Sequence, residues 1–271
     1  MNNLIISLDG GLGNQLFMLF AGISKTIDEK RDFRIYLENN KRKFYFNSYF
    51  DFLKNKILNY NPIINNYYIE PFHHYNQIPN NCDFIKGYFQ SPKYFENNYL
   101  YLRKLFKIDE FQNKFKFDFK YIAIHFRLGD YLELKGAHIT IPDDYYINGL
   151  IYLKEKLGNE FDNYKFIVFG EIINDDIISN KINEIKKIIN INFIKYYDIN
   201  NDNDDFKEFI YMSNAEHLII ANSTYSWFSA YLCNNKNKII IRPSYDNWYG
   251  ENLRHLNLKD FCPPEWIIIN Q

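Results

Sequence analysis

The residues best suited to chemistry lie at positions 125–131, which read His-Phe-Arg-Leu-Gly-Asp-Tyr and follow an apolar run. Such a run predicts a strand, and in open α/β sheets ligands bind at the carboxyl ends of strands. Arg127 suits a diphosphate because its guanidinium is planar, always protonated and able to form paired hydrogen bonds. The alternative is a surface ion pair between Arg127 and Asp130 at a turn, and this segment alone does not decide between the two.

A glycine-rich turn near the amino terminus offers a second place for a ligand. Residues 4–8 predict a strand, and apolar residues at helical spacing predict a helix that starts at Asn14. Gly11 and Gly13 let the backbone approach a ligand closely, and the helix start presents unpaired N–H groups to an anion or a sugar. Asn14 and Gln15 are expected to face that ligand, or else to form only the helix cap and first turn.

A third segment, residues 218–232, repeats the order of apolar strand, hydroxyl-rich turn and aromatic helix. Asn222, Ser223, Thr224 and Ser226 lie where this helix should begin. Their polar groups, together with the helix N–H groups, are suited to surrounding a phosphate. Capping of the helix would explain Ser223 and Thr224 equally well.

Together, these segments resemble the alpha-1,2-fucosyltransferase family (glycosyltransferase family 11), within the wider group of GDP-fucose-dependent fucosyltransferases. Gly-Gly-Leu-Gly-Asn-Gln at residues 10–15 resembles the first motif of that family, and the Gly-Tyr-Phe-Gln and Pro-Lys-Tyr-Phe of residues 87–95 resemble its second. Residues 125–131 resemble its His-x-Arg-x-Gly-Asp-Tyr signature, and residues 208–232 its carboxyl-terminal block. The motifs occur in order and extend over nearly the whole chain, as in the shorter bacterial or viral members.

The resemblance implies an inverting transfer of L-fucose from GDP-fucose to the 2-hydroxyl of a galactoside on a glycan. Negative charge develops on GDP as the glycosidic bond breaks, and a fixed cation beside that charge lowers the barrier. Arg127 is expected to supply the cation. Ser223, Thr224 and Ser226 are expected to hold the phosphates from the other side.

The guanine ring presents N1–H and an amino group that together suit a carboxylate, and Glu208 occupies the acidic position of the family's carboxyl-terminal block. His125 is the second expected contact to guanine or ribose, unless it is only a histidine hydrogen-bonded at a strand end. A general base would deprotonate the acceptor hydroxyl. Asp130 is the nearest motif carboxylate but would serve equally to orient Arg127. Asp9 is a further candidate, although many members lack an acid there.

Three positions depart from the family pattern. Leu128 stands where many members have a second arginine, so the diphosphate is expected to lose one cationic contact. Gly170-Glu171 replaces the usual Ser-Asp-Asp, and Trp227-Phe228-Ser229 replaces the usual Trp-Trp-Gly. Two alternatives therefore stay open: a GDP-sugar transferase of the same scaffold with a different donor or linkage, and a non-catalytic glycan-binding relative.

The formal net charge of −1 over 271 residues gives no support for nucleic-acid binding. Three scattered cysteines favour free thiols in a reducing compartment, and no apolar run approaches the ~20 residues of a membrane span. We therefore expect a cytoplasmic enzyme without a transmembrane anchor. No metal or other cofactor is expected, because Asp202 and Asp204 have Asp-x-Asp spacing only within an asparagine-rich loop. The acceptor glycan and the oligomeric state are not indicated.

Strand patterns alternate with helix patterns, which predicts an α/β fold with parallel sheets covered by helices. The expected strands are residues 4–8, 33–37, 83–87, 121–126, 165–169, 191–196, 217–221 and 238–242. The expected helices are residues 14–30, 143–157, 177–190, 205–213 and 224–233.

The resemblance implies two Rossmann-like lobes of the GT-B type, with the active site in the cleft between them. The boundary is expected in the loop at residues 131–142. This gives an acceptor-side lobe at residues 1–135 and a GDP-sugar-binding lobe at residues 136–271. The carboxyl-terminal segment around Pro263 and Pro264 is expected to pack back on the first lobe.

Overall fold

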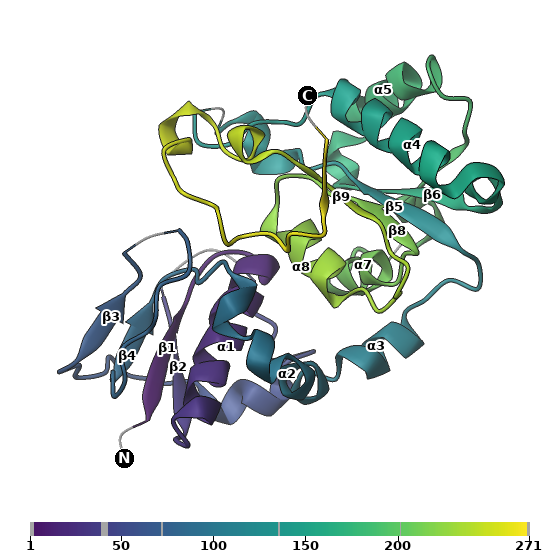
Figure 1. The fold of residues 1–271 in the computed structure, drawn as a ribbon. Coiled ribbons are helices and arrows are strands. Elements are labelled where there is room, and N and C mark those ends of the chain that lie inside the picture. Colours follow the sequence, from purple (N-terminus) through teal and green to yellow (C-terminus); the bar gives the residue numbers. More distant parts are fainter. Residues whose placement is uncertain (1–2, 39–42, 72, 135, 201, 270–271) are drawn as a thin grey trace. The chain divides into compact units, whose positions relative to one another are not determined.

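The computed structural model describes residues 3–38, 43–71, 73–134, 136–200 and 202–269 (Figure 1). Contacts divide the chain into two compact units. The first comprises Met1–Glu110 and Leu256–Pro264, and the second comprises Phe111–His255 and Glu265–Gln271. Each unit is built on its own sheet.

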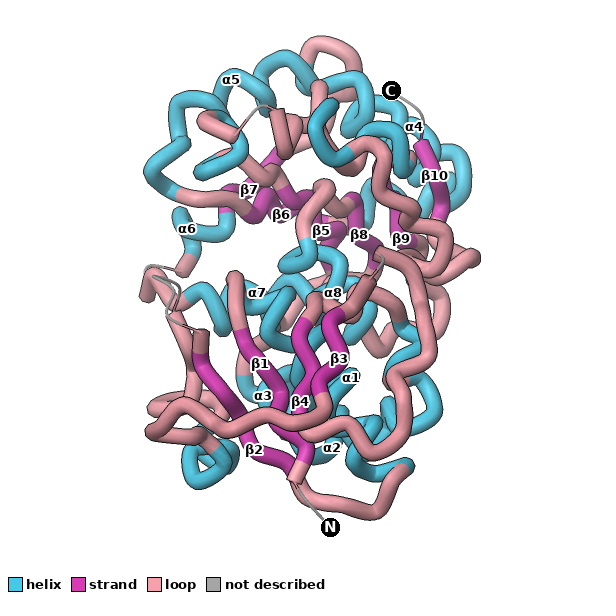
Figure 2. Tube along the Cα trace, turned by 90° about the vertical axis from the view of Figure 1, so that its left-hand side faces the viewer, coloured by secondary structure: helices cyan, strands magenta, loops and turns pink. Residues whose placement is uncertain are grey.

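The sheet of the first unit contains β1 (Leu4–Leu8), β2 (Phe33–Leu37), β3 (Tyr67–Ile69) and β4 (Phe84–Lys86). All neighbours are parallel, in the order β2-β1-β4-β3 (Figure 2). The long helix α1 (Leu12–Asp28) packs on β1, and the short helices α2 (Tyr99–Leu105) and α3 (Ile108–Lys114) follow the last strand.

The segment Leu256–Pro264 returns from the end of the chain to the first unit. The ring of Phe261 lies 6.0 Å from that of Phe17 on α1. The Ser91 hydroxyl donates to the carbonyl of Asp260 at 2.8 Å, and the ammonium of Lys93 pairs with the carboxylate of Asp260. Pro263 and Pro264 therefore count with the first unit, whereas the residues after them count with the second.

The sheet of the second unit is parallel throughout, in the order β10-β9-β8-β5-β6-β7. Its strands are β5 (Tyr121–His125), β6 (Lys165–Phe169), β7 (Phe193–Lys195), β8 (His217–Ile219), β9 (Ile240–Pro243) and β10 (Ile267–Ile269). β5 and β8 are apolar along almost their full length, as expected for strands that are covered on both faces. The elements that cover them are helices.

Helices α4 (Asp143–Leu157) and α5 (Asp175–Lys186) lie on one face of this sheet, and α7 (Asp205–Ser213) and α8 (Thr224–Leu232) lie on the other (Figure 1). A further short helix, α6 (Tyr196–Ile199), follows β7. The core beneath α4 and α5 contains side chains from both helices and from the central strands, among them Ile122, Ile124, Leu150, Val168, Ile178 and Ile219.

Each sheet has one point at which the strand order reverses. In the first sheet the chain goes from β1 to β2 on one side and later adds β4 on the other. In the second sheet it goes from β5 through β6 to β7 and then places β8 on the opposite side of β5 (Figure 2). Ligands of open α/β folds bind at the carboxyl ends of the strands at such a switch point. The two places to examine are therefore the ends of β1 and β4 and the ends of β5 and β8.

The predicted fold class, α/β with two Rossmann-like units, is confirmed by these two parallel sheets. The boundary differs from the expectation: it falls after Glu110 and not near residue 135. The physical reason is that β5 pairs with β6 and β8, so the strand that carries the His-x-Arg motif belongs to the second sheet.

The elements predicted from periodicity are present, with ends that shift by up to four residues. Two strands were not predicted, β3 and β10. Each has three residues and lies at an edge of its sheet, and a run of three residues is too short to show a strand periodicity. Three short helices, α2, α3 and α6, were not predicted either.

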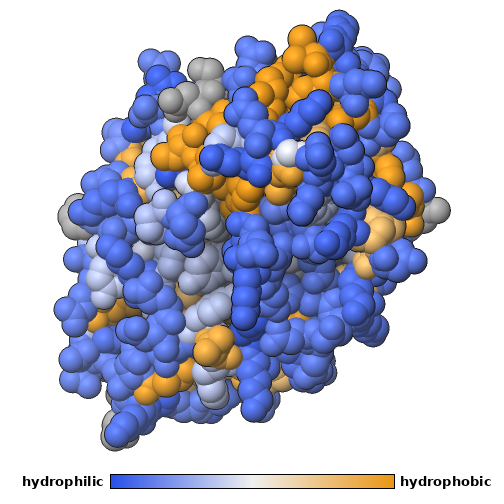
Figure 3. Space-filling view, turned by 45° about the vertical axis from the view of Figure 1, so that its right-hand side comes forward, coloured by the Kyte–Doolittle hydropathy of each residue, from blue (hydrophilic) through white to orange (hydrophobic). Residues whose placement is uncertain are grey.

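The face of the molecule drawn in Figure 3 is mainly hydrophilic, with apolar side chains gathered in its upper part. Within the described ranges, no helix combines the length and the apolar character that a membrane crossing requires.

Candidate active site

Arg127 lies two residues beyond the end of β5, at the switch point of the second sheet. One amino group of its guanidinium donates to Glu171 at 2.7 Å, and the other donates to Asp130. Its guanidinium carbon lies 4.9 Å from the centre of the Tyr131 ring. Two carboxylates and an aromatic face therefore fix the orientation of the cation.

Glu171 is a site residue that the sequence reasoning missed, because Gly170-Glu171 was interpreted only as a departure from the family pattern. It follows β6, and β6 neighbours β5, so Glu171 reaches the same sheet edge as Arg127. Gly129 has φ +41°, and a Cβ atom there would collide with the Glu171 carboxylate. The glycine of the motif thus makes room for this ion pair.

Leu128 is buried and belongs to the hydrophobic core beneath α4 and α5. The Leu128 side chain therefore lies in the core, whereas the Arg127 side chain lies at the edge of the sheet. An arginine at position 128 with this backbone would carry its charge into the core, at a cost of several kcal/mol unless it were paired. The second cation that many family members have is thus not supplied from this position, in line with the expectation from Leu128.

His125 is the last residue of β5, and its side chain is buried. The centre of its ring lies 5.8 Å from the centre of the Tyr225 ring. Burial and the nearby positive charge of Arg127 lower the pKa of His125 to about 3, so the ring is neutral at physiological pH. Its Nδ1 is buried and has no hydrogen-bond partner among the described residues. A neutral imidazole in this position is able to donate to or accept from a ligand.

Glu208 lies in the first turn of α7 and is partly buried. Burial, followed by the negative charges of Asp205, Glu171 and Asp202, raises the pKa of Glu208 to about 8. The influence of Glu171 places Glu208 in the same electrostatic neighbourhood as Arg127. The carboxyl group therefore holds a proton at neutral pH.

The polar residues after β8 have unequal roles. Asn222 donates its amide to the carbonyls of Ile139 and Trp248, both at 2.9 Å, and its Oδ1 is buried without a partner in the described parts of the chain. Ser223 caps α8 by accepting from the N–H of Tyr225. Asn222 therefore keeps an acceptor for a ligand, whereas Ser223 is engaged as the predicted helix cap.

Ser226 and Thr224 differ in exposure. The Ser226 hydroxyl is fully buried and donates to the carbonyls of Ala221 and Ser223, each at 3.3 Å. These bonds hold the turn, and the full burial of the hydroxyl differs from the phosphate-facing position expected from the sequence. Thr224, the first residue of α8, is only partly buried.

The switch point of the first sheet brings together the two motifs at residues 10–15 and 87–90. Gly11 caps α1, and Gly13 is buried within its first turn. The Gln90 amide donates to Oδ1 of Asn14 at 3.0 Å. Asn14 and Gln90 thus join the ends of β1 and β4.

Gln15 ties the glycine turn to a later loop. Its amide donates to the carbonyl of Gly10 at 2.9 Å and to that of Lys43 at 2.8 Å, and its Oε1 is buried without a partner within the described ranges. Its position inside α1 makes it a support for the turn more than a ligand contact.

Asp202 and Asp204, the pair with Asp-x-Asp spacing, have local partners. Asp204 caps α7 by accepting from the N–H groups of Phe206 and Lys207, and Asp202 pairs with the ammonium of Lys207 at 2.6 Å. No group of three or more residues that could hold a metal ion occurs in the part of the chain that the structure describes.

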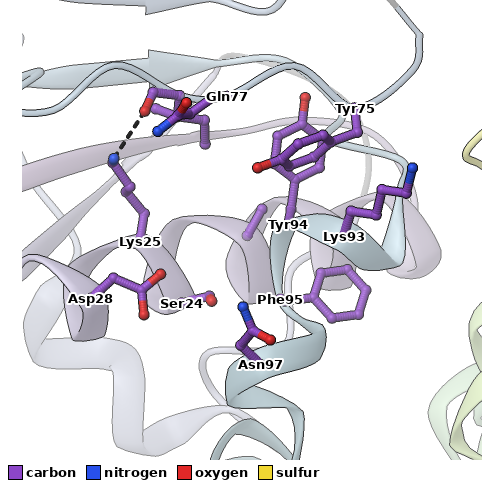
Figure 4. Close-up of a pocket in the computed structure, with 11 residues that line it drawn as sticks. Ser24, Lys25, Asp28, Tyr75, Gln77, Lys93, Tyr94, Phe95 and Asn97 are labelled. Carbon is purple, nitrogen blue, oxygen red and sulfur yellow. Dashed lines mark hydrogen bonds between the residues drawn. The ribbon is translucent and has the colours of Figure 1, made fainter.

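A cavity of about 130 Å³ in the first unit lies beside the carboxyl-terminal half of α1 (Figure 4). Lys25, Asp28, Tyr75, Lys93 and Tyr94 contribute to its lining, and Lys25 is held by the carbonyl of Ile78 at 2.9 Å. The volume is below the ~300 Å³ typical of small-molecule sites. None of the predicted site residues lines this cavity.

Comparison with known proteins identifies the class. The family model described as Glycosyl transferase family 11 matches residues 30–270. The chain therefore belongs to glycosyl transferase family 11, whose members use a nucleotide-sugar donor and a glycan acceptor. It is 26% identical to an alpha-1,2-colitosyltransferase from Escherichia coli, over an alignment that covers all of both chains.

Two solved structures are more distantly similar. Escherichia coli ADP-heptose LPS heptosyltransferase II has a TM-score of 0.34 and 11% identity, over 60% of this chain and 42% of that one. A family 9 glycosyl transferase from Veillonella parvula DSM 2008 has a TM-score of 0.43 and 8% identity, over 100% of this chain and 85% of that one.

Proposed function

We propose that this glycosyltransferase moves L-fucose from GDP-fucose to the 2-hydroxyl of a galactoside, with inversion, to form an α-1,2 linkage. One observation carries the proposal. Arg127 Nε, His125 Nδ1 and Asn222 Oδ1 are buried around the ends of β5 and β8 and have no partner among the described residues. Buried polar atoms are rarely left unpaired. Three unpaired polar atoms at the switch point of a sheet therefore indicate that a polar ligand binds there.

A diphosphate would pair with Arg127 after one of the two carboxylates that bind the guanidinium has dissociated from it. Glu171 is the more exposed of the two, at 44% against 29% for Asp130, and it comes from a separate strand end. Asp130 lies three residues from Arg127 and would stay to orient it. The N–H groups at the start of α8, with the Thr224 hydroxyl, would hold the phosphates from the other side.

Guanine is the base that suits Glu208. The ring offers two parallel N–H donors, and a carboxylate accepts both. Since the pKa of Glu208 is about 8, binding of guanine would release its proton near neutral pH. His125, neutral and buried, would contact guanine or ribose.

The chemical step would use these groups electrostatically. As the bond between fucose and the β-phosphate breaks, its electron pair moves to the phosphate oxygen and the sugar becomes cation-like. Arg127 and the α8 N–H groups would stabilise the charge on GDP, and such preorganised stabilisation is commonly the largest contribution to catalysis. No cofactor or metal enters this scheme.

Colitosyl transfer is the second candidate, and it is favoured by one observation. The relative from Escherichia coli that matches the full length of the chain is an alpha-1,2-colitosyltransferase. The two candidates share the GDP-binding groups and differ in the sugar. A donor comparison therefore separates them.

The predicted cytoplasmic location remains part of the proposal.

The test is GDP release from GDP-fucose, GDP-colitose and GDP-mannose, with UDP-galactose as the base control, against galactoside acceptors and with EDTA present. We expect acceptor-dependent release from GDP-fucose that EDTA does not change, and product NMR that gives the α-1,2 linkage. Faster release from GDP-colitose would establish the second candidate. Turnover of UDP-galactose alone, or loss of activity in EDTA, would contradict the proposal.

Arg127→Ala provides the site control in this assay, and Arg34→Ala is its matched comparison. Arg34 is also a partly exposed arginine in an ion pair, with Asp32 at 3.4 Å, on β2. Activity should be lost in the first variant and kept in the second. Binding of GDP-fucose to the wild-type protein without turnover of any acceptor would favour a non-catalytic glycan-binding relative.

A further inference from the structure

Arg242 is a buried arginine of the second unit that the proposed function does not use. It lies on β9, and its side chain is only 5% exposed. Among the described residues its guanidinium makes one hydrogen bond, from Nη1 to the carbonyl of Pro243 at 3.0 Å, and no ion pair with a carboxylate. Because arginine is always charged in proteins, its burial leaves a positive charge without an anionic partner.

The unused edge of this guanidinium has the form of an anion site. Nε of Arg242 is buried and has no hydrogen-bond partner within the described ranges. The guanidinium carbon lies 4.2 Å from the centre of the Tyr245 ring, which fixes the plane of the group. Since Nη1 is engaged, Nε and Nη2 form the edge that remains. Two parallel N–H groups of this kind match two oxygens of a phosphate or a carboxylate.

The Arg242 side chain lies on the face of the second sheet that α7 and α8 cover. Its neighbour Ile241 belongs to the hydrophobic core beneath α4 and α5, on the other face. Successive side chains of a strand point to opposite faces of the sheet. The side chain of Arg242 therefore points to the face on which α8 begins.

Arg127 lies on this face as well. Phe126 and Leu128, which precede and follow it, both belong to the core beneath α4 and α5. Arg127 therefore points away from that core. His125, two residues earlier, confirms the direction, because its ring lies 5.8 Å from that of Tyr225 on α8.

The two arginines flank the strand that leads into α8. The sheet order places β8 between β5 and β9 (Figure 2). The N–H of Ile220 donates to the carbonyl of Ile241 at 2.9 Å, so the pairing with β9 continues to the turn before α8. Asn222 in this turn binds the loop after β9, through the carbonyl of Trp248. Strands lie ~4.8 Å apart, so β5 and β9 are separated by about 10 Å, which two arginine side chains can span from either side.

The charges around Arg127 leave room for a second cation. Asp130 and Glu171 both bind its guanidinium, so two negative charges face one positive charge. Leu128 adds no charge, and the start of α8 adds only N–H groups. Arg242 has the charge and the unused edge that a diphosphate needs here.

From this geometry we infer that Arg242 is the second cation of the donor site. It binds the diphosphate of the nucleotide sugar from the β9 side of α8, while Arg127 binds it from the β5 side. The inference rests on the proposed function. The N–H groups at the start of α8 lie between the two arginines and complete the site. The bound diphosphate gives the buried guanidinium of Arg242 the anionic partner that it otherwise lacks.

The test is calorimetric titration of GDP into Arg242→Met, with Arg34→Ala as the control. Methionine is unbranched and apolar, so it removes the charge and fills most of the space. Arg242→Met should weaken GDP binding roughly 10- to 100-fold, as for loss of a hydrogen bond to a charged group. Arg34→Ala should leave the affinity unchanged, because Arg34 lies on β2 of the first sheet.

Thermal unfolding of the ligand-free proteins gives a second readout, for which Arg103→Met is the matched variant. Arg103 is also 5% exposed, but it pairs with Asp109 at 2.7 Å. Breaking this pair should lower Tm, whereas removal of the unpaired Arg242 charge should leave Tm unchanged or raise it. Weaker GDP binding together with a lower Tm in Arg242→Met would indicate a structural role and overturn the inference.

Guanosine separates a lost phosphate contact from a disturbed fold. It carries the base and ribose of GDP but no phosphate. Its affinity, measured by saturation-transfer NMR, should therefore be the same in Arg242→Met and the wild type. Equal weakening of guanosine and GDP would contradict a contact between Arg242 and the diphosphate.

The outcomes also separate this inference from the proposed function. Unchanged GDP affinity in Arg242→Met, with weaker binding in Arg127→Ala, would overturn the role of Arg242 and leave the proposed function intact. A wild-type protein that binds neither GDP nor GDP-fucose would contradict both.

Discussion

The ends of β5 and β8 and the ends of β1 and β4 share one construction and differ in charge. Each pair of strands flanks the switch point of a parallel sheet. In each pair, one strand leads through a motif into a helix, β1 into α1 and β8 into α8. The first place holds a cation between two carboxylates, with Glu208 nearby. The second holds the amides of Asn14 and Gln90, and the partly buried Glu70 lies one strand away, directly after β3.

This difference suggests a division of labour between two versions of the same scaffold. A fixed arginine suits the diphosphate of a nucleotide sugar. Amides, which both donate and accept hydrogen bonds, suit the hydroxyl groups of a neutral sugar. The predictions below test whether the chemistry at the ends of β5 and β8 follows from their charge.

The largest effect is expected from Arg127. Arg127→Ala should lower kcat/KM roughly 100- to 1000-fold, as for the loss of one preorganised donor to a developing negative charge. Arg127→Lys should recover part of this loss, since it keeps the charge without the planar fork. Steady-state kinetics on both variants measure this. Equal activity of the alanine variant and the wild type would remove the cation from the mechanism.

Glu208 should make GDP binding dependent on pH. Its pKa is raised to about 8 in the free protein, and guanine binding would require the ionised form. Affinity should therefore rise by about tenfold per pH unit from pH 6 to pH 8 and level off above that, as for release of one proton.

Calorimetry in buffers of different ionisation enthalpy should detect the released proton directly. In Glu208→Gln both the pH dependence and the proton release should vanish. Affinity that is independent of pH in the wild-type protein would contradict the assignment of guanine to Glu208.

A smaller effect is expected from Glu171. In Glu171→Gln the ion pair that competes with the diphosphate is lost, so the donor should bind more tightly. Because a partly exposed pair contributes ~0.2–1 kcal/mol, the gain should be at most about fivefold. Titration of GDP at low and high salt measures it. Weaker binding would mean that Glu171 supports the bound donor and does not compete with it.

The smallest effects distinguish two hydroxyls on α8. Ser226→Ala should leave GDP affinity unchanged and lower stability by about 1 kcal/mol, since its buried hydroxyl bonds only to backbone carbonyls. Thr224→Ala should weaken GDP binding a few-fold, by about the worth of one hydrogen bond, with little change in stability. Thermal unfolding and calorimetry test the pair. The reverse pattern would place the phosphates elsewhere.

The sequence predicted the features that depend on local order. Strands β1 and β5 are mainly apolar five-residue strands, and β8, of three residues, continues into the apolar Ile220 and Ala221. The motifs that follow these strands carry their own turn and helix signals. The position of Arg127 at a strand end could therefore be predicted from residues 121–131 alone. The buried role of Ser226 could not, because it depends on how the helix turns its hydroxyl inward.

The features that depend on strand order could not be predicted. Glu171 reaches Arg127 only because β6 neighbours β5, and Glu70 meets residues 87–89 only because the three-residue strand β3 pairs with β4. In the sequence these partners are 44 and 19 residues apart. The unit boundary was misplaced for the same reason: β5 lies before the predicted boundary but pairs within the second sheet.

The most direct test of the account is calorimetric titration of GDP into the wild-type protein, Arg127→Ala and Arg34→Ala. The account predicts binding that Arg127→Ala weakens at least tenfold, as for loss of a charge-assisted contact worth more than ~1.4 kcal/mol, and that Arg34→Ala leaves unchanged. Equal affinity in all three proteins would contradict the claim that the ends of β5 and β8 form the nucleotide-sugar site.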